Sequence, residues 1–188
     1  PVCVTEAGYI DAAIELAQRG VVIATFGDML NVPGSHATLA SVRSEGARIE
    51  VCYSPTAALD LAGKEQETEV VFLAIGFETT IPPVISLVDK AIQHQVSNLS
   101  LLTAFKRVPP ALAVLASDPE LKIDAFLCPA HVSAIIGAEA YHPFAREYKR
   151  PCVIAGFEPL DILLGLKGIL EQLRDGRAEV DNQYNRVV

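Results

Sequence analysis

Short apolar runs alternate along the chain with segments in which apolar residues recur every three or four positions. The clearest run is Val-Val-Phe-Leu-Ala-Ile-Gly at 70–76, whose composition is typical of a strand buried on both faces. Six such strands are predicted. They cover residues 21–26, 49–53, 70–76, 99–103, 124–128 and 152–155. Because helices are predicted between them, the sequence favours an α/β fold with parallel sheets flanked by helices on both faces.

The segments between these strands carry helix start and stop signals. The predicted helices cover residues 9–19, 35–45, 55–63, 80–92, 109–116, 131–136 and 159–175. Ser35 is the expected N-cap of the second helix, and Thr79 or Thr80 that of the fourth, whose first turn accommodates two prolines. The last helix has one apolar face, the side that normally packs on a core. That face consists of Leu160, Leu163, Leu166, Ile169, Leu170 and Leu173.

The sequence Gly-Phe-Glu occurs twice, at 76–78 and 156–158, each time between a strand and a helix. This repetition predicts two similar Rossmann-like units. The polar run at 64–69 is the best candidate for the boundary between them, with an ordinary solvated loop as the alternative. We therefore expect a first, partial α/β unit at 1–66 and a second at 67–160. Residues 161–188 would then form a helix and C-terminal tail that could pack back on the first unit.

Composition narrows the class of protein. The 188 residues are 51% hydrophobic, enough to bury a sizeable core, yet no apolar run approaches the roughly 18–20 residues that span a bilayer. The formal net charge of −8 argues against a nucleic-acid or anionic-membrane partner. The four cysteines are too widely spaced for a disulfide-rich secreted scaffold. A reducing cytoplasm is the expected compartment.

Polar residues that directly follow strands form the candidate site, because parallel α/β sheets bind ligands outside the carboxyl ends of their strands. These residues are Asp28, Glu78, Thr79, Thr80, His131 and Glu158. Glu78 and Glu158 each begin a helix, where capping is the structural alternative to an acid–base or ligand-holding role. His131 forms a Cys-x-x-His pair with Cys128, a weak metal signal without a second pair. Phosphate-binding glycine loops and a nucleophile elbow are missing from the sequence.

The four cysteines differ in their expected surroundings. Cys3 precedes the predicted helix at 9–19, where the helix dipole favours a thiolate, although a thiol without a function is an equal alternative. Cys52 and Cys152 lie in apolar strands and are interpreted as buried, inert thiols. Cys128, at a strand end, is expected to be intermediate.

Eight short motifs occur in one order along the chain. They are Pro-Val-Cys-Val at 1–4, Thr-Phe-Gly-Asp-Met at 25–29, Val-Pro-Gly-Ser at 32–35, Tyr-Ser-Pro at 53–55, Gly-Phe-Glu-Thr-Thr at 76–80, Pro-Ala-His-Val-Ser at 129–133, Ala-Gly-Phe-Glu-Pro-Leu-Asp at 155–161 and Asn-Gln-Tyr at 182–184. Together they resemble the hydrogenase maturation protein HypD family over nearly the whole chain. The resemblance implies two similar α/β domains and a further part that carries a [4Fe-4S] cluster.

The resemblance also implies a function. HypD proteins help to build the Fe(CN)2CO group of [NiFe]-hydrogenases in complex with the small chaperone HypC, while HypE delivers cyanide. Cys3 matches the second cysteine of the family's Cys-Pro-x-Cys-Val motif. Asn31 stands where the family commonly has Arg, and Ala130 replaces the Gly of Pro-Gly-His-Val. We expect a central fragment that lacks the N-terminal part and the C-terminal iron–sulfur part, so that the cluster belongs only to the full-length protein.

Two hypotheses follow, of which we favour the first. In an assembly scaffold, Cys3 would be the iron ligand or redox thiol beside Glu78 and His131, with thiolate suited to a soft iron–cyanide–carbonyl unit. The bound intermediate would also be held by Asp28, Thr79, Thr80 and Glu158. In the alternative, an α/β enzyme would use Glu78, Glu158 and His131 as acid–base groups on a small metabolite. In either case both units are expected to contribute residues to one cleft.

Overall fold

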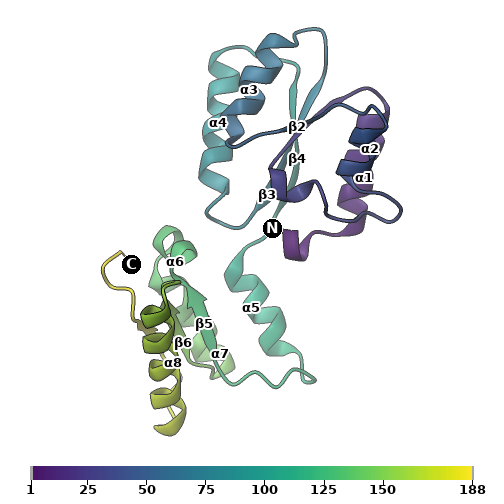
Figure 1. Ribbon diagram of the computed structural model, residues 1–188. Helices are drawn as coiled ribbons and strands as arrows, with labels where there is room; N and C mark the ends of the chain where they lie inside the picture. The colour runs from purple at the N-terminus through teal and green to yellow at the C-terminus, as the bar shows by residue number, and fades with distance from the viewer. Residues whose placement is uncertain (1, 188) are drawn as a thin grey trace. The chain divides into compact units, whose positions relative to one another are not determined.

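The computed structural model describes residues 2–187, which divide into two compact units, one ending at Lys106 and the other beginning at Arg107 (Figure 1). The first unit contains η1 (Val2–Val4), α1 (Ala7–Gln18), β1 (Val22–Thr25), η2 (Gly27–Met29), α2 (Leu39–Ser44), β2 (Ile49–Val51), α3 (Pro55–Lys64), β3 (Val70–Gly76), α4 (Ile81–Gln93) and β4 (Leu99–Phe105). The second contains α5 (Val108–Ser117), β5 (Phe126–Pro129), α6 (Ala130–Ile136), η3 (Ala138–Tyr141), α7 (His142–Tyr148), β6 (Cys152–Ala155), α8 (Pro159–Arg174) and β7 (Val180–Asn182).

Each unit is built on one parallel sheet. The strand order is β2-β1-β3-β4 in the first unit and β5-β6-β7 in the second. The predicted α/β class, with parallel sheets flanked by helices, is confirmed. All six predicted strands are present, but β7 was not predicted, because Val-Asp-Asn is too short and polar to stand out from a loop.

The central strand β3 shows how the first unit is layered. All of its residues are buried, and they alternate between two apolar clusters. Val71, Leu73 and Ile75 pack with α1 and α2 on one face of the sheet. Val70, Phe72 and Ala74 pack with α3 and α4 on the other face. Figure 1 shows the two helix pairs on opposite sides of this sheet. A strand with helices on both faces has no polar side, which explains the continuous apolar run in the sequence.

The predicted domain boundary at 64–69 is wrong. The run connects α3 to β3 within the first unit, and β3 pairs with β1 from Val22 onward. The Asn98 side-chain amide donates to the carbonyl oxygens of Ala62, Glu65 and Thr68 at 2.9–3.1 Å. One half-buried amide therefore fixes the polar loop to the end of its own sheet. The units expected at 1–66 and 67–160 do not exist as such.

The C-terminal segment belongs to the second unit. Strand β7 pairs with β6 in parallel, and α8 packs on β5 and β6. Residues 161–188 are therefore part of the second unit rather than a separate piece. The segment completes a sheet that would otherwise have only two strands.

Helix α8 packs on its sheet with the opposite face from the one that the sequence favoured. Its buried residues are Asp161, Gly165, Gly168 and Gln172. The apolar face predicted to be the packing side carries five leucines that are exposed. A Cβ atom added at Gly165 would lie 2.8 Å from the Ala155 Cβ atom and 2.5 Å from the Leu127 Cδ1 atom. The helix therefore lies so close to the sheet that only a residue without a side chain fits there.

The N-cap predicted for the second helix is also wrong. Helix α2 begins after Thr38, whose hydroxyl accepts a hydrogen bond from the Ser41 amide while the Ser41 hydroxyl accepts one from the Thr38 amide. This reciprocal capping box satisfies two backbone donors. Ser35 instead donates its amide and hydroxyl to the two carboxylate oxygens of Asp11, at 2.8 and 2.6 Å. It ties the loop to α1.

Candidate functional site

The strand order places two predicted site segments at the ends of neighbouring strands. In the first sheet β1 lies between β2 and β3, so the chain moves from β1 to β2 on one side and then crosses back to β3 on the other. Ligands of α/β sheets bind at such a point, outside the carboxyl ends of the strands. Asp28 lies in η2 directly after β1, and the segment 77–80 follows β3. The structure therefore brings these two predicted segments to the same edge of one sheet.

The turn after β3 is tightly built. The Thr80 amide donates to the Phe77 carbonyl oxygen at 3.0 Å, and the Thr80 side chain lies against the Cα atom of Gly76, leaving no room for a Cβ atom there. Glu78 is only 6% exposed. Thr80 is the N-cap residue of α4 but makes no side-chain capping hydrogen bond. Close packing, rather than capping, explains the glycine and the threonine.

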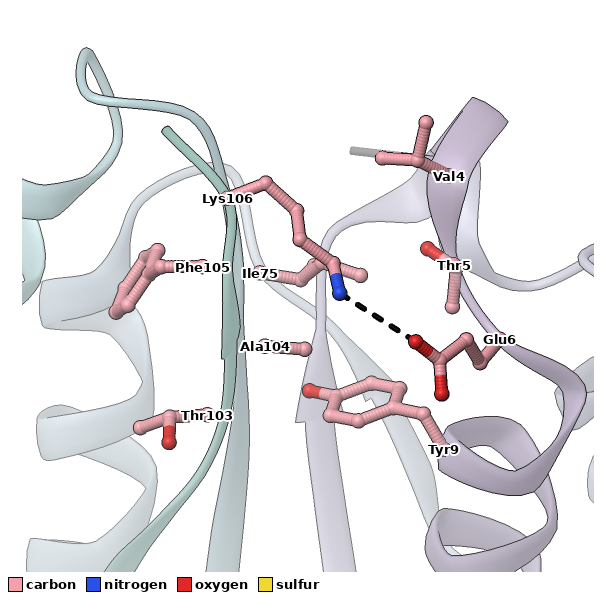
Figure 2. Close-up of a pocket in the computed structure, with 9 residues that line it drawn as sticks. All are labelled: Val4, Thr5, Glu6, Tyr9, Ile75, Thr103, Ala104, Phe105 and Lys106. Carbon is pink, nitrogen blue, oxygen red and sulfur yellow. Dashed lines mark hydrogen bonds and ion pairs between the residues drawn. The ribbon is translucent and has the colours of Figure 1, made fainter. Parts of the chain in front are cut away.

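A pocket of about 480 Å³ lies beside this turn, at the carboxyl ends of β3 and β4 (Figure 2). It is lined by Val4, Thr5, Glu6, Tyr9, Ile75, Thr103, Ala104, Phe105 and Lys106. The Lys106 ammonium lies 3.4 Å from a Glu6 carboxylate oxygen. Figure 2 shows this pair facing across the pocket, with the Tyr9 ring beneath it. The pocket is thus amphipathic, with an ion pair over apolar walls.

Two contacts fix the walls of this pocket. The Tyr9 hydroxyl donates to the Leu102 carbonyl oxygen at 2.7 Å, and burial raises the pKa of Tyr9 far above its usual value. The Lys106 amide donates to the Gly76 carbonyl oxygen at 3.0 Å. The pocket therefore joins the start of α1 to the same turn that carries Glu78.

Cys3 is the exposed thiol of the chain, and it lies in η1, one residue before the pocket lining begins at Val4. The other three cysteines are buried. Burial raises the pKa of Cys52. Cys128 is 2% exposed, so the expectation that it is intermediate is wrong. A hydrogen bond to Cys152 on the neighbouring strand, and then burial, raise the pKa of Cys128.

The second unit gathers its own polar residues at the carboxyl ends of β5 and β6. The His131 ring lies 5.0 Å from the Phe157 ring, centroid to centroid. Glu158 is exposed, with a carboxylate oxygen 4.0 Å from Arg186. Arg186 also bonds the Asp161 carboxylate at 2.8 Å. A histidine and a carboxylate–guanidinium cluster thus occupy this edge.

Arg186 is the residue that sequence reasoning missed. Its guanidinium lies 4.3 Å from the centre of the Tyr184 ring as well as on the nearly buried Asp161 carboxylate. A lone arginine in a polar C-terminal segment carries no pattern that distinguishes it from a solvated side chain. Only the pairing of β7 with β6 brings the segment to the start of α8.

The two Gly-Phe-Glu turns are not equivalent. Glu78 is buried in its turn, whereas Glu158 is exposed beside an arginine. Asp28, Glu78, Thr79 and Thr80 belong to the first unit, while His131 and Glu158 belong to the second. The hypothesis that both units share one cleft stays a prediction.

Metal-binding side chains are not clustered in the part of the chain that the structure describes. Between residues 2 and 187, no three His, Cys, Asp or Glu side chains lie close enough together to hold a metal ion. Cys128 is buried while His131 is exposed, and no third ligand joins this Cys-x-x-His pair among the described residues. Over the same residues, no helix combines the length and apolar character needed to cross a bilayer.

Comparison with known proteins matches the chain to one family, both by a family model and by individual relatives. The family model described as "HypD: Hydrogenase formation hypA family" matches residues 1–188. The hydrogenase maturation factor HypD of Azotobacter vinelandii is 47% identical over 195 residues, which cover all of this chain and 52% of that protein. The factors of the same name from Cupriavidus necator and Escherichia coli K12 are 43% and 41% identical, again over the whole chain and 52% and 51% of their own lengths. The chain spans about half the length of these relatives.

Proposed function

Because the chain belongs to the HypD family of hydrogenase formation proteins, we propose that it acts in [NiFe]-hydrogenase maturation as an assembly scaffold for the Fe(CN)2CO group. The iron unit would be the cargo of such a scaffold rather than its resident cofactor. The observation that carries the proposal is the position of Cys3. Cys3 is exposed and directly precedes Val4, which lines a pocket at the carboxyl edge of a parallel sheet.

The chemistry of the cargo fits this edge. A thiolate is a soft ligand and suits iron that carries cyanide and carbonyl. Cyanide ligands give the unit negative charge, which the Lys106 ammonium would compensate by exchanging its Glu6 partner for the cargo. Asp28, Glu78, Thr79 and Thr80 would hold or shield the intermediate from the neighbouring strand ends.

A partner is needed because one thiolate does not hold an iron ion. The remaining ligands would come from cyanide, carbonyl and a second protein. A HypC-like chaperone would supply that second protein surface, and a HypE-like protein would donate cyanide. His131 and Glu158 of the second unit would contact the cargo or the chaperone.

Two further expectations belong to the full-length protein. Its [4Fe-4S] cluster would supply or accept electrons for the Cys3 thiol. The compartment would be the cytoplasm, where thiols stay reduced.

The decisive experiment is infrared spectroscopy on the full-length protein purified with its HypC-like chaperone. Cyanide and carbonyl bands are expected from the complex and are expected to vanish in Cys3→Ala. Cys52→Ala is the matched control, because it removes a thiol from the buried side of the same unit and should leave the bands in place. Bands that persist in Cys3→Ala would contradict the role of the thiol. Saturable turnover of a small metabolite without partner proteins would favour the α/β enzyme instead.

A further inference from the structure

The outer face of α8 is a row of exposed leucines. Leu163, Leu166, Leu170 and Leu173 are 63%, 44%, 66% and 42% exposed. The opposite side of the helix packs on β5 and β6 through Gly165 and Gly168 rather than through large apolar residues. The helix therefore contacts its own sheet through glycines, and its leucines do not contribute to that contact.

The spacing of these leucines is specific. Steps of three, four and three residues separate positions 163, 166, 170 and 173, which is the a/d pattern of a seam between two packed helices. A seam of this kind accepts a helix rather than a strand or a loop, because its knobs and holes repeat every 3.5 residues. We name these four residues the leucine seam.

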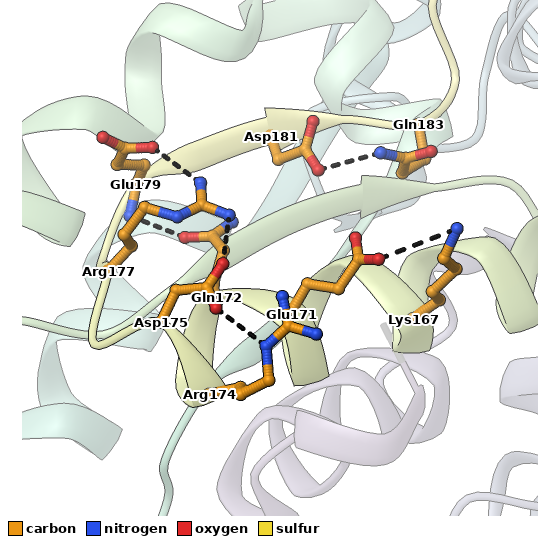
Figure 3. Close-up of polar contacts among 9 residues, drawn as sticks. All are labelled: Lys167, Glu171, Gln172, Arg174, Asp175, Arg177, Glu179, Asp181 and Gln183. Atoms are coloured by element: carbon orange, nitrogen blue, oxygen red, sulfur yellow. Dashed lines mark hydrogen bonds and ion pairs between the residues drawn. The ribbon is translucent and has the colours of Figure 1, made fainter.

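The leucine seam borders an apolar groove with charged residues at its rim. An apolar groove of about 430 Å³ is lined by three of the leucines and by the side chains of Lys167, Glu171 and Arg174. Lys167 and Glu171 lie 3.7 Å apart, and Arg174 bonds Asp175 at 2.8 Å (Figure 3). The rim charges are thus paired within α8 and its C-cap residue. An apolar centre with a satisfied polar rim has the composition of an interface.

We infer that the leucine seam is covered by an amphipathic helix from the part of the full-length protein that lies outside residues 1–188. The matched relatives are about twice as long as this chain, so they hold nearly as many residues again. That length is ample for a further helix.

The small size of the seam favours an intramolecular occupant. Ten residues of helix rise about 15 Å, and a helix is about 10 Å across. A strip of this size is well below the roughly 800 Å² that each partner contributes to a standard stable complex. A separate protein held by the seam alone would also lose its translational freedom on binding, whereas a segment of the same polypeptide loses far less. The covering helix would be present whether or not the protein carries iron.

The test is thiol accessibility in the full-length protein. Leu166→Cys and Leu170→Cys are made separately, with Val114→Cys as the control, because Val114 is 69% exposed in α5 of the same unit. Maleimide labelling of the native monomer is followed by peptide mass spectrometry. The thiols introduced at 166 and 170 should react at least about tenfold more slowly than the one at 114, because they are reached only when the covering helix opens. A cross-linker placed at 170 should capture a peptide from outside residues 1–188.

Several results would overturn the inference. Labelling at 166 and 170 as fast as at 114 in the monomer means that no helix covers the seam. Protection that appears only in a dimer assigns the seam to a second copy, and protection that appears only with added HypC-like chaperone assigns it to that partner. A cross-link to residues 2–106 assigns it to the first unit. As a second measurement, Leu170→Glu should lower the thermal midpoint of the full-length protein, whereas Val114→Glu should not.

Discussion

Gly165→Ala is expected to destabilise the second unit, although alanine is the better helix former. Position 165 is in the middle of α8, where alanine in place of glycine favours an isolated helix by about 1 kcal/mol. The added methyl group would lie 2.8 Å from the Ala155 Cβ atom, whereas carbon atoms normally pack 3.5–4.0 Å apart. Ala155 is in a fully buried strand and cannot rotate away, so α8 itself must shift.

The two effects can be weighed. Overpacking by one methyl group typically costs about 1–3 kcal/mol, which exceeds the gain in helix propensity. We expect a net loss of about 1 kcal/mol in the free energy of unfolding of the second unit. Gly63→Ala in α3 is the matched control, because a Cβ atom there meets nothing within 4 Å. It should stabilise the first unit by up to about 1 kcal/mol.

Gly168→Ala gives an intermediate case. Its Cβ atom would lie 3.1 Å from an Asp181 carboxylate oxygen and 3.5 Å from Val153, so a small adjustment is enough and a change near zero is expected.

The assay is native-state hydrogen exchange with mass spectrometry, because it reports the opening free energy of α8 and α3 separately even if the two units unfold independently. Peptides from α8 should lose protection in Gly165→Ala, and peptides from α3 should gain it in Gly63→Ala. An α8 that is more protected in Gly165→Ala than in the parent protein would refute the close approach of helix and sheet.

Three further predictions can be tested on the same protein. Iodoacetamide should alkylate Cys3 within minutes in the native state and reach the three buried thiols only on opening, so a buried thiol that reacts as fast would contradict the assignment of Cys3 as the accessible one. The hydrogen bonds from Ser35 lower the pKa of Asp11, so this contact stabilises the fold above the ordinary carboxyl pKa and is lost as the pH falls through the lowered one. Ser35→Ala should therefore be less stable than the parent in urea titrations at neutral pH and equal to it at about pH 2, and an unchanged difference would argue against the linkage. Arg186→Gln should speed hydrogen exchange at 180–187, because it leaves the nearly buried Asp161 carboxylate without its guanidinium partner, and unchanged exchange would show that the ion pair does not hold the tail.

The strands were predictable because burial on both faces requires a continuous run of apolar residues, which is visible in the local sequence. Residues 70–76, at the centre of the first sheet, and 152–155, at the centre of the second, must be apolar on every side chain, and the sequence shows this directly. The boundary between the units was not predictable in the same way. A polar run has the same composition whether it connects two units or forms a loop within one. The hydrogen bonds from Asn98 that hold this run within the first unit come from a residue about 30 positions away.

The candidate site was likewise predictable in part. The rule that ligands meet the carboxyl ends of parallel strands placed Asp28 and Glu78 at one edge, as the strand order bears out. The sequence could not distinguish Glu78 from Glu158, because both follow Gly-Phe. Only the structure shows that Glu78 is buried in its turn, whereas Glu158 is exposed beside Arg186.

By itself the sequence determined the fold class, the six main strands and the family, since each depends on local composition or on motifs in a fixed order. Only the tertiary structure decided which face of α8 is inside. Periodicity identifies an apolar stripe but not the surface that it meets, and the space above Leu127 and Ala155 admits glycine alone. The leucines therefore point away from the sheet, because the distance between helix and sheet, rather than the hydrophobicity of the helix, sets its orientation.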